Sequence, residues 1–398
     1  MTKTILCLAS YFKGTEFLVA CKRAEATVLL MTRDKLRDAA WPHDSIDEIF
    51  YMPSLSTFPD IIYSVSYLAR SRIIDQVIPL DDYDVLTAAE LREHLRLPGM
   101  GATAARYVRD KLAMRQGAGD AGLPVPRFKH VLHHHQLYEF MRDVPGPWLL
   151  KPRGEAGAMG IKQINSYDDL WRWLEQLGDE QSNFLLEEFI IGDVYHVDSI
   201  VWDGEVIFAA PHQYGKPPIQ VAHQGGVFMS RSLDPESNVG RALIVQNAAV
   251  LEALGMRQGV AHTEFIRSEV DGKYYFVETA GRVGGASISD LIEQASGINL
   301  WAEWCRLELA ALQGVEYQLP TVREGYAGIL VCLARQQYPD MSSYDDPEVV
   351  WRMQKEHHAG VIVRSDDPER VEALLERYAI RFGEDFLAVA PPLDKPPT

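Results

Sequence analysis

Residues 261–285 read AHTEFIRSEVDGKYYFVETAGRVGG, and this stretch decides the fold. Apolar and polar side chains alternate on both sides of Asp271-Gly272, a dipeptide that is typical of a tight hairpin turn. The alternation predicts two antiparallel strands, Val260–Arg267 and Tyr274–Glu278, which this turn joins.

Each of these strands carries a carboxylate. Glu264 and Glu278 lie about equally far from the turn, so we expect them to face each other across the strand pair. Facing carboxylates repel unless a proton or a metal ion lies between them, and carboxylate oxygens suit Mg²⁺. Two solvated strand residues would give the same pattern, so the pair alone leaves both interpretations open.

A basic, glycine-rich turn follows the second strand. Arg282 lies four residues after Glu278, within GRVGG. A guanidinium at this place could clamp a phosphoryl or carboxylate group, and a helix expected from about Ile288 would add its positive N-terminal end. A purely structural turn is the alternative.

A second candidate for phosphate binding lies earlier in the chain. Lys151 ends the apolar strand pattern WLLK and is followed by PRGEAGAMG, in which small residues predominate. Small residues let backbone N–H groups approach phosphate oxygens closely, and the lysine would add a point charge. A flexible surface turn is the alternative, and the loop is not a Walker A motif because no Gly-Lys-Ser/Thr follows.

Two more segments belong to the same series. Lys111 lies on a helix predicted over Ala102–Gly119, where a lysine is ordinarily a solvated surface residue. The segment LLEEFI, Leu185–Ile190, is an apolar strand pattern that ends in two carboxylates shortly before Gly192. Extended backbone at a domain hinge can hydrogen-bond an adenine edge.

Length and composition limit the class of protein. The chain has 398 residues, which predicts two to four compact units, and a formal net charge of -17, which disfavours nucleic acid and anionic membranes as partners. No apolar run is long enough to span a bilayer, and the N-terminus lacks a signal-peptide pattern, so we expect a cytoplasmic protein. The cysteines form no CxxC pair, which argues against a zinc site: Cys7, Cys21, Cys305 and Cys332.

The order and spacing of these motifs resemble the ATP-grasp superfamily, which includes D-alanine–D-alanine ligase, biotin carboxylase and the L-amino-acid ligases. The resemblance covers roughly residues 106–303. It implies an α/β protein with the ATP-grasp fold, in which a parallel αβ domain precedes a two-lobed, nucleotide-binding grasp with antiparallel sheets. The expected division is an N-terminal domain, a first lobe, a second lobe with the metal site and a small C-terminal αβ unit: 1–105, 106–190, 191–320 and 321–398.

The resemblance also implies roles for individual residues. Glu264 and Glu278 would hold Mg²⁺, Arg282 would steady the transferred phosphoryl group, and Lys151 would act with it in catalysis. The nucleotide contacts would come from the two lysines, the small-residue loop and the hinge: Lys111, Lys151, Gly154, Ala156, Gly157, Ala158, Met159, Glu187, Glu188, Ile190 and Asp193. Substrate contacts are expected from the region around the cleft: His196, Tyr214, His223 and Gly284.

Two positions depart from the family pattern. Many members have Glu-x-Asn, in which the asparagine helps to bind a second Mg²⁺, and here that position is Ala280. Asp193 stands beside Val194, where a ribose-binding glutamate is common. The number of Mg²⁺ ions, one or two, therefore stays open.

The activity that the resemblance implies is ATP-dependent ligation of a carboxylate to an amine through an acyl phosphate. The partners would be small-molecule substrates, with an amino acid among them and a homodimer as an option. A biotin-carboxylase-like enzyme that makes carboxyphosphate and a nucleotide-binding protein without catalysis are the alternatives. The sequence names neither substrate, and it leaves the role of His357 and His358 open.

Overall fold

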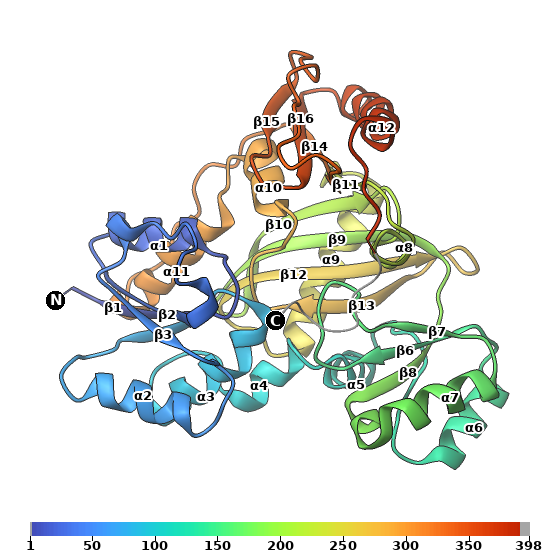
Figure 1. The fold of residues 1–398 in the computed structure, drawn as a ribbon, viewed down its shortest axis with the longest axis horizontal. Helices are drawn as coiled ribbons and strands as arrows, with labels where there is room; N and C mark the ends of the chain where they lie inside the picture. The colour runs from blue at the N-terminus through green and yellow to red at the C-terminus, as the bar shows by residue number, and fades with distance from the viewer. Residues whose placement is uncertain (1, 391–398) are drawn as a thin grey trace.

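The computed structural model describes residues 2–390 and contains three sheets (Figure 1). The N-terminal sheet is parallel and has the strand order β3-β2-β1-β4. Both faces are covered, because alternate residues of β1 pack to opposite sides: Ile5 and Cys7 toward α1, Leu6 and Leu8 toward α2 and α3. The elements are β1 (Thr4–Ala9), α1 (Thr15–Arg23), β2 (Thr27–Arg33), β3 (Glu48–Met52), α2 (Asp60–Ala69), β4 (Gln76–Pro79) and α3 (Val85–Leu95).

A small antiparallel sheet with the order β5-β8-β6-β7 follows. Leu150 and Leu186 face α6 and α7 in one apolar cluster, so the alternating residues Leu149, Lys151 and Glu187 point to the other face. Because successive side chains of a strand point to opposite faces, Lys151 points away from the apolar core of this lobe. The elements are β5 (Phe128–His130), α6 (His134–Asp143), β6 (Trp148–Pro152), β7 (Lys162–Ile164), α7 (Tyr167–Leu177) and β8 (Phe184–Glu188).

The largest sheet is antiparallel, with the order β13-β12-β9-β10-β11-β14-β16-β15. Helices α5 and α9 pack on one face, and α10 and α11 pack on the other, where α11 also contacts α1 of the N-terminal sheet (Figure 1). Helix α12 covers β14 and β16. The elements are β9 (Gly192–Trp202), β10 (Glu205–Tyr214), α8 (Pro218–Gln224), β11 (Phe228–Ser232), α9 (Asn238–Ala253), β12 (Gly259–Ser268), β13 (Tyr274–Ala280), α10 (Ile288–Ser296), α11 (Leu300–Gln313), β14 (Tyr326–Leu333), β15 (Val349–Arg352), β16 (His358–Ser365) and α12 (Pro368–Asp385).

The predicted hairpin is confirmed, and the predicted single helix over Ala102–Gly119 is wrong. β12 and β13 pair with Glu264 opposite Glu278, and a bulge follows directly after this pair. The expected helix is divided into α4 (Ala102–Tyr107) and α5 (Lys111–Asp120). The Asp110 side chain accepts a hydrogen bond from the Leu112 backbone N–H at 2.9 Å, which starts a new helix at this point.

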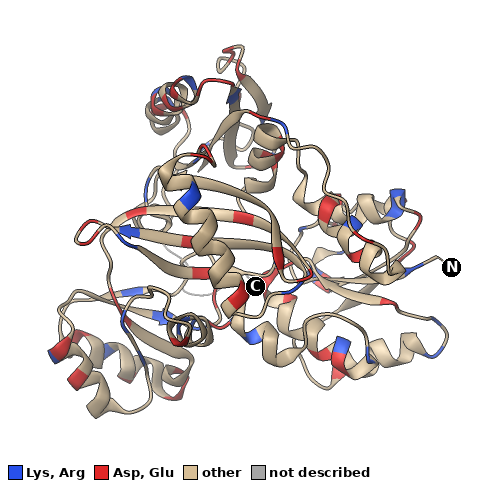
Figure 2. Cartoon of the chain, turned by 180° about the vertical axis from the view of Figure 1, so that it is seen from behind, with Lys and Arg blue, Asp and Glu red and all other residues tan. Residues whose placement is uncertain are grey.

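Charges of both signs are spread over all parts of the ribbon, as Figure 2 shows. Among residues 2–390, no helix is both long and apolar enough to cross a membrane. The four cysteines are buried and free.

Candidate active site

A cavity of about 1100 Å³ lies where the small sheet, the large sheet and the end of the N-terminal sheet meet. Its lining includes most of the site residues expected from the sequence: Lys151, Ala156, Gly157, Ala158, Met159, Glu187, Glu188, Ile190, Asp193, Tyr214, His223, Glu264, Glu278 and Arg282. Residues that lie more than 130 positions apart in the chain therefore face one space. The remaining expected residues lie outside this lining: Lys111, Gly154, His196 and Gly284.

Glu278 is held between positive charges. Lys111 Nζ lies 2.9 Å from its Oε2 and also donates to the Glu155 carbonyl at 2.5 Å. Burial would raise the pKa of Glu278, but the charges of Lys111 and Lys151 outweigh it, so the pKa is lowered. Lys111 is thus a buried residue at the first turn of α5 that ties the Gly/Ala loop to the acidic pair, rather than a solvated one.

Glu187 belongs to a buried ion triad. Its carboxylate pairs with Lys151 and accepts from Arg115 Nε at 3.0 Å, and its side chain is 2% exposed. Burial would raise the pKa of Glu187, but Arg115 and Lys151 lower it below its usual range. The carboxylate is therefore ionised and holds Lys151 in place at the cavity wall. Sequence reasoning missed Arg115, although it lies four residues after Lys111 and so on the same face of α5.

One end of the cavity is apolar. Leu149, Met159, Ile161, Phe189 and Ile190 line it from the small sheet and from the segment that joins the two lobes. This lining is a suitable environment for a flat, weakly polar ring that is bound next to a charged group.

Arg282 connects the second lobe to the N-terminal domain. Its guanidinium pairs with Asp82, which follows β4, and donates to the Val283 carbonyl at 2.8 Å. Burial would raise the pKa of Asp82, but Arg282 and Arg109 lower it to about 2. Within residues 2–390, Arg282 Nε is buried and has no hydrogen-bond partner, so one donor of the guanidinium is available to an oxyanion.

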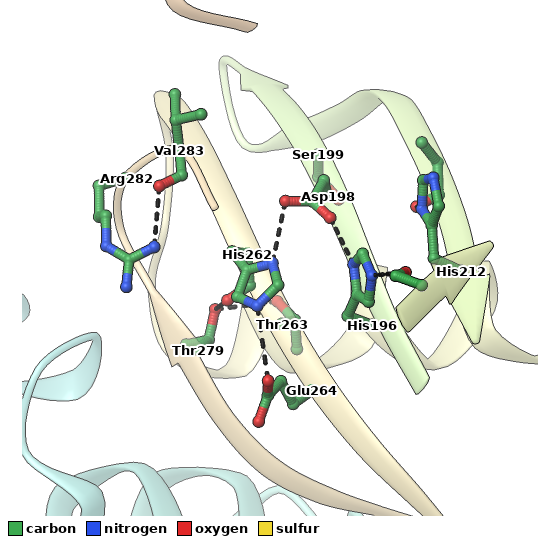
Figure 3. Close-up of polar contacts among 12 residues, drawn as sticks. His196, Asp198, Ser199, His212, His262, Thr263, Glu264, Thr279, Arg282 and Val283 are labelled. Carbon is green, nitrogen blue, oxygen red and sulfur yellow. Dashed lines mark hydrogen bonds and ion pairs between the residues drawn. The ribbon is translucent and has the colours of Figure 1, made fainter. Parts of the chain in front are cut away.

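A buried polar network lies behind Glu264 (Figure 3). Asp198 accepts from His196 Nδ1 at 2.7 Å and from His262 Nδ1 at 2.9 Å, while His262 Nε2 lies 3.6 Å from Glu264. Tyr214 donates its hydroxyl to Glu264 at 2.8 Å. Burial would lower the pKa of His262, but Asp198 raises it to about 10, so the imidazolium faces both carboxylates. Tyr214 and His262 therefore both contact Oε1 of Glu264 and hold this oxygen in place.

This geometry corrects the expectations for His196 and Gly284. His196 is fully buried, and its Nε2 is 2.7 Å from Ser230 Oγ, so it does not reach the cavity. A Cβ on Gly284 would lie 2.9 Å from Asp198 Oδ1, so this glycine makes room for the network rather than for a substrate. His262 was missed because its contacts come from a neighbouring strand.

The comparisons with known proteins agree with this architecture. No family model matches the chain. It is 28% identical over 271 residues to the L-arginine-specific L-amino acid ligase of Bacillus subtilis, covering 63% of this chain and 65% of that protein. It is 23% identical over 218 residues to the D-alanine–D-alanine ligase of Pseudomonas putida, covering 52% and 67%. The chain thus spans about two thirds of the length of these curated relatives.

Solved structures show the same fold over nearly the whole chain. An L-amino acid ligase from Bacillus licheniformis superposes with a TM-score of 0.73 at 17% identity, covering 98% of both chains. A biotin carboxylase from Campylobacter jejuni gives 0.72 at 16% identity, covering 97% of this chain and 92% of that one. The chain has the ATP-grasp fold, and its similarity in sequence is to ATP-dependent ligases. L-amino acid ligases are among the proteins similar to it both in sequence and in fold.

Proposed function

We propose that this protein is an ATP-dependent ligase that activates a carboxylate as an acyl phosphate and joins it to an amine, with an amino acid as one substrate. The observation that supports this most is the shared cavity, where facing carboxylates, a buried lysine and a guanidinium with a spare donor lie beside an apolar end. Each of these groups matches one part of a metal-bound nucleoside triphosphate or of the group that it transfers.

The residues present fit ATP. The apolar end would hold the adenine, with backbone from Glu188 to Ile190 along its edge, and Asp193 would meet the ribose. Lys151 would meet the phosphates from the cavity wall, Lys111 would support the site from behind through Glu278 and the Glu155 carbonyl, and the Gly154–Gly160 loop would cover the phosphates. Three residues in this loop have a positive φ, 65° at Gly157, 60° at Ala158 and 68° at Gly160, and such turns can bring neighbouring backbone N–H groups together around an anion. The carboxylate of Glu187 would act through Lys151, since both of its oxygens face cations.

The acidic pair fits Mg²⁺. Glu264 and Glu278 are directly opposite on β12 and β13, and their remaining neighbours are donors and cations that keep both carboxylates oriented. Bound Mg²⁺ would neutralise phosphate charge there. Ala280 offers no ligand for a second ion, so we propose one protein-held site.

The chain's own groups would carry the chemistry electrostatically. An oxygen of the substrate carboxylate would attack the γ-phosphorus, the bond from that phosphorus to the bridging oxygen would break and ADP would leave, while Arg282 would stabilise charge on the transferred group through its spare donor. The amine would then attack the acyl carbon, lose a proton to solvent and expel inorganic phosphate. The Gly/Ala loop, held to the N-terminal domain by the 2.8 Å hydrogen bond from Tyr83 to Glu155, would exclude water that could hydrolyse the acyl phosphate.

Phosphate release from Mg-ATP, screened against single amino acids and then against pairs, tests this function. Release that requires one pair, together with a product whose mass is the sum of the two minus water, is the expected result. Release that needs biotin and bicarbonate instead would favour a carboxylase. ATP binding without turnover on any carboxylate would refute the ligase.

A further inference from the structure

The N-terminal sheet has its topological switch point at the cavity. From β1 the chain moves outward to β2 and β3, then crosses back to place β4 on the other side of β1. In open parallel sheets, the crevice between two such strands at their carboxyl ends is the place where ligands bind. Four residues that follow β1 and β4 line the cavity there: Tyr11, Lys13, Asp81 and Tyr83.

The loop that forms one side of this crevice is closely packed. Gly14 has a φ of 74°, and a Cβ at this position would lie 2.9 Å from the Leu80 side chain. The loop after β1 therefore packs directly against the residue before Asp81. The rings of Tyr11 and Tyr83 stand 5.3 Å apart beside it.

Lys13 is the cation that this crevice presents. Its Nζ lies 2.5 Å from Asp81 Oδ2, and the lysine side chain is 40% exposed while that of Asp81 is 0% exposed. An ammonium carries three donors, so Lys13 can hold Asp81 and a ligand carboxylate at once. The buried aspartate points the ammonium into the cavity.

The position of Lys13 separates it from the phosphate machinery. Lys13 pairs with Asp81, whereas Arg282 pairs with Asp82 and Lys111 with Glu278, so Lys13 is held by a carboxylate that no proposed phosphate-binding group uses. Under the proposed function, Lys151 and Arg282 meet the charge of the nucleotide. Lys13 is a further cation on the cavity wall, and its side chain is 40% exposed, so it favours a second anion there.

We propose that this crevice binds the amine-donating substrate, an α-amino acid, and that Lys13 contacts its free carboxylate. Asp81 is the positioning residue that holds Lys13. This inference rests on the proposed ligase function and adds to it the site and the charged group of the second substrate.

The test uses Lys13→Met with the substrate pair found by the phosphate-release screen. We expect the KM of the amine donor to rise about tenfold or more, the loss of one charge-assisted contact, while the KM of ATP and of the activated acid changes less than twofold. The amide of the same amino acid, which lacks the carboxylate charge, should show the same KM with both proteins. Lys13→Arg should restore most of the loss.

Lys22→Met is a matched control, because Lys22 belongs to the same domain, is 39% exposed and pairs with Asp47 at 2.6 Å. It should leave every KM unchanged. Asp81→Asn combined with Lys13→Met removes the carboxylate that the single change leaves unpaired, and the selective effect should persist.

Three results would overturn the subsite. The first is a KM for the amine donor within twofold of wild type, and the second is an equal rise in KM for the amine-donating amino acid and for its amide. The third is a rise confined to the KM of the activated carboxylate substrate. If wild type ligates no pair at all, the proposed function fails instead, and the two failures are thereby distinguished.

Discussion

Replacing Asp198 with asparagine should destabilise the second lobe strongly. Asp198 is fully buried and accepts from both His196 and His262. Burial would raise its pKa, but the two imidazoles lower it far below the usual range, so the native state contains the charged form. The amide keeps the shape and removes the charge, which leaves the His262 imidazolium buried without this partner.

Removing one partner of a buried ion pair costs about 3–5 kcal/mol. Where exchange reports the free energy of opening, a loss of 3 kcal/mol corresponds to roughly 150-fold faster amide exchange. Hydrogen–deuterium exchange of peptides from β9 and β12 measures this directly. We expect those peptides to lose protection while peptides from the N-terminal sheet keep theirs.

Asp203→Asn is the matched control, because Asp203 lies at the turn after the same strand and pairs with Arg257 at 2.7 Å with both side chains exposed. Exposed pairs contribute about 1 kcal/mol or less, so its exchange should stay near that of wild type. Equal protection of β9 in Asp198→Asn and wild type would refute the reasoning about the network.

Three further predictions concern the site and its surroundings. Glu278→Gln removes a charge from the acidic pair and should lower kcat by about 100-fold or more, measured by phosphate release, with an unchanged kcat contradicting the metal assignment. Tyr83→Phe removes the hydrogen bond to Glu155, worth about 1 kcal/mol, and should speed proteolysis of the Gly/Ala loop roughly fivefold in the absence of nucleotide. Burial first, and then the neighbouring His196 imidazole, lower the pKa of His212 to about 3. This base is therefore neutral in the native state, and its stability contribution is lost as pH falls below about 6.5. His212→Phe should therefore reduce the loss of stability between pH 7 and pH 5, in denaturant titrations, by about 2 kcal/mol, and an unchanged loss would argue against a buried neutral imidazole.

The local features of the site could be predicted from the sequence. The similar distances of Glu264 and Glu278 from Asp271-Gly272 predict that they face each other, and they do. The turn is longer than two residues, because the Ser268 N–H donates to the Lys273 carbonyl, so the final register depends on the bulge after Glu264. The alternation in WLLK likewise directs Lys151 away from the lobe's apolar core.

The remaining contacts depend on tertiary packing. Asp82 lies 200 residues before Arg282, and nothing local to either residue links them. β9 is buried on both faces from Val194 to Val201, so alternation along it cannot tell which side meets the cavity, and His196 was assigned to the wrong side for this reason. The break before Lys111 follows from a single capping aspartate within an otherwise helical pattern.

Oxygen transfer tests the central claim most directly. The carboxylate substrate is labelled with ¹⁸O in both oxygens, and inorganic phosphate is collected after turnover with ATP and the amine. Ligation through an acyl phosphate predicts one ¹⁸O atom in each phosphate released, in step with the amide formed. Amide formation with unlabelled phosphate would contradict the proposed mechanism.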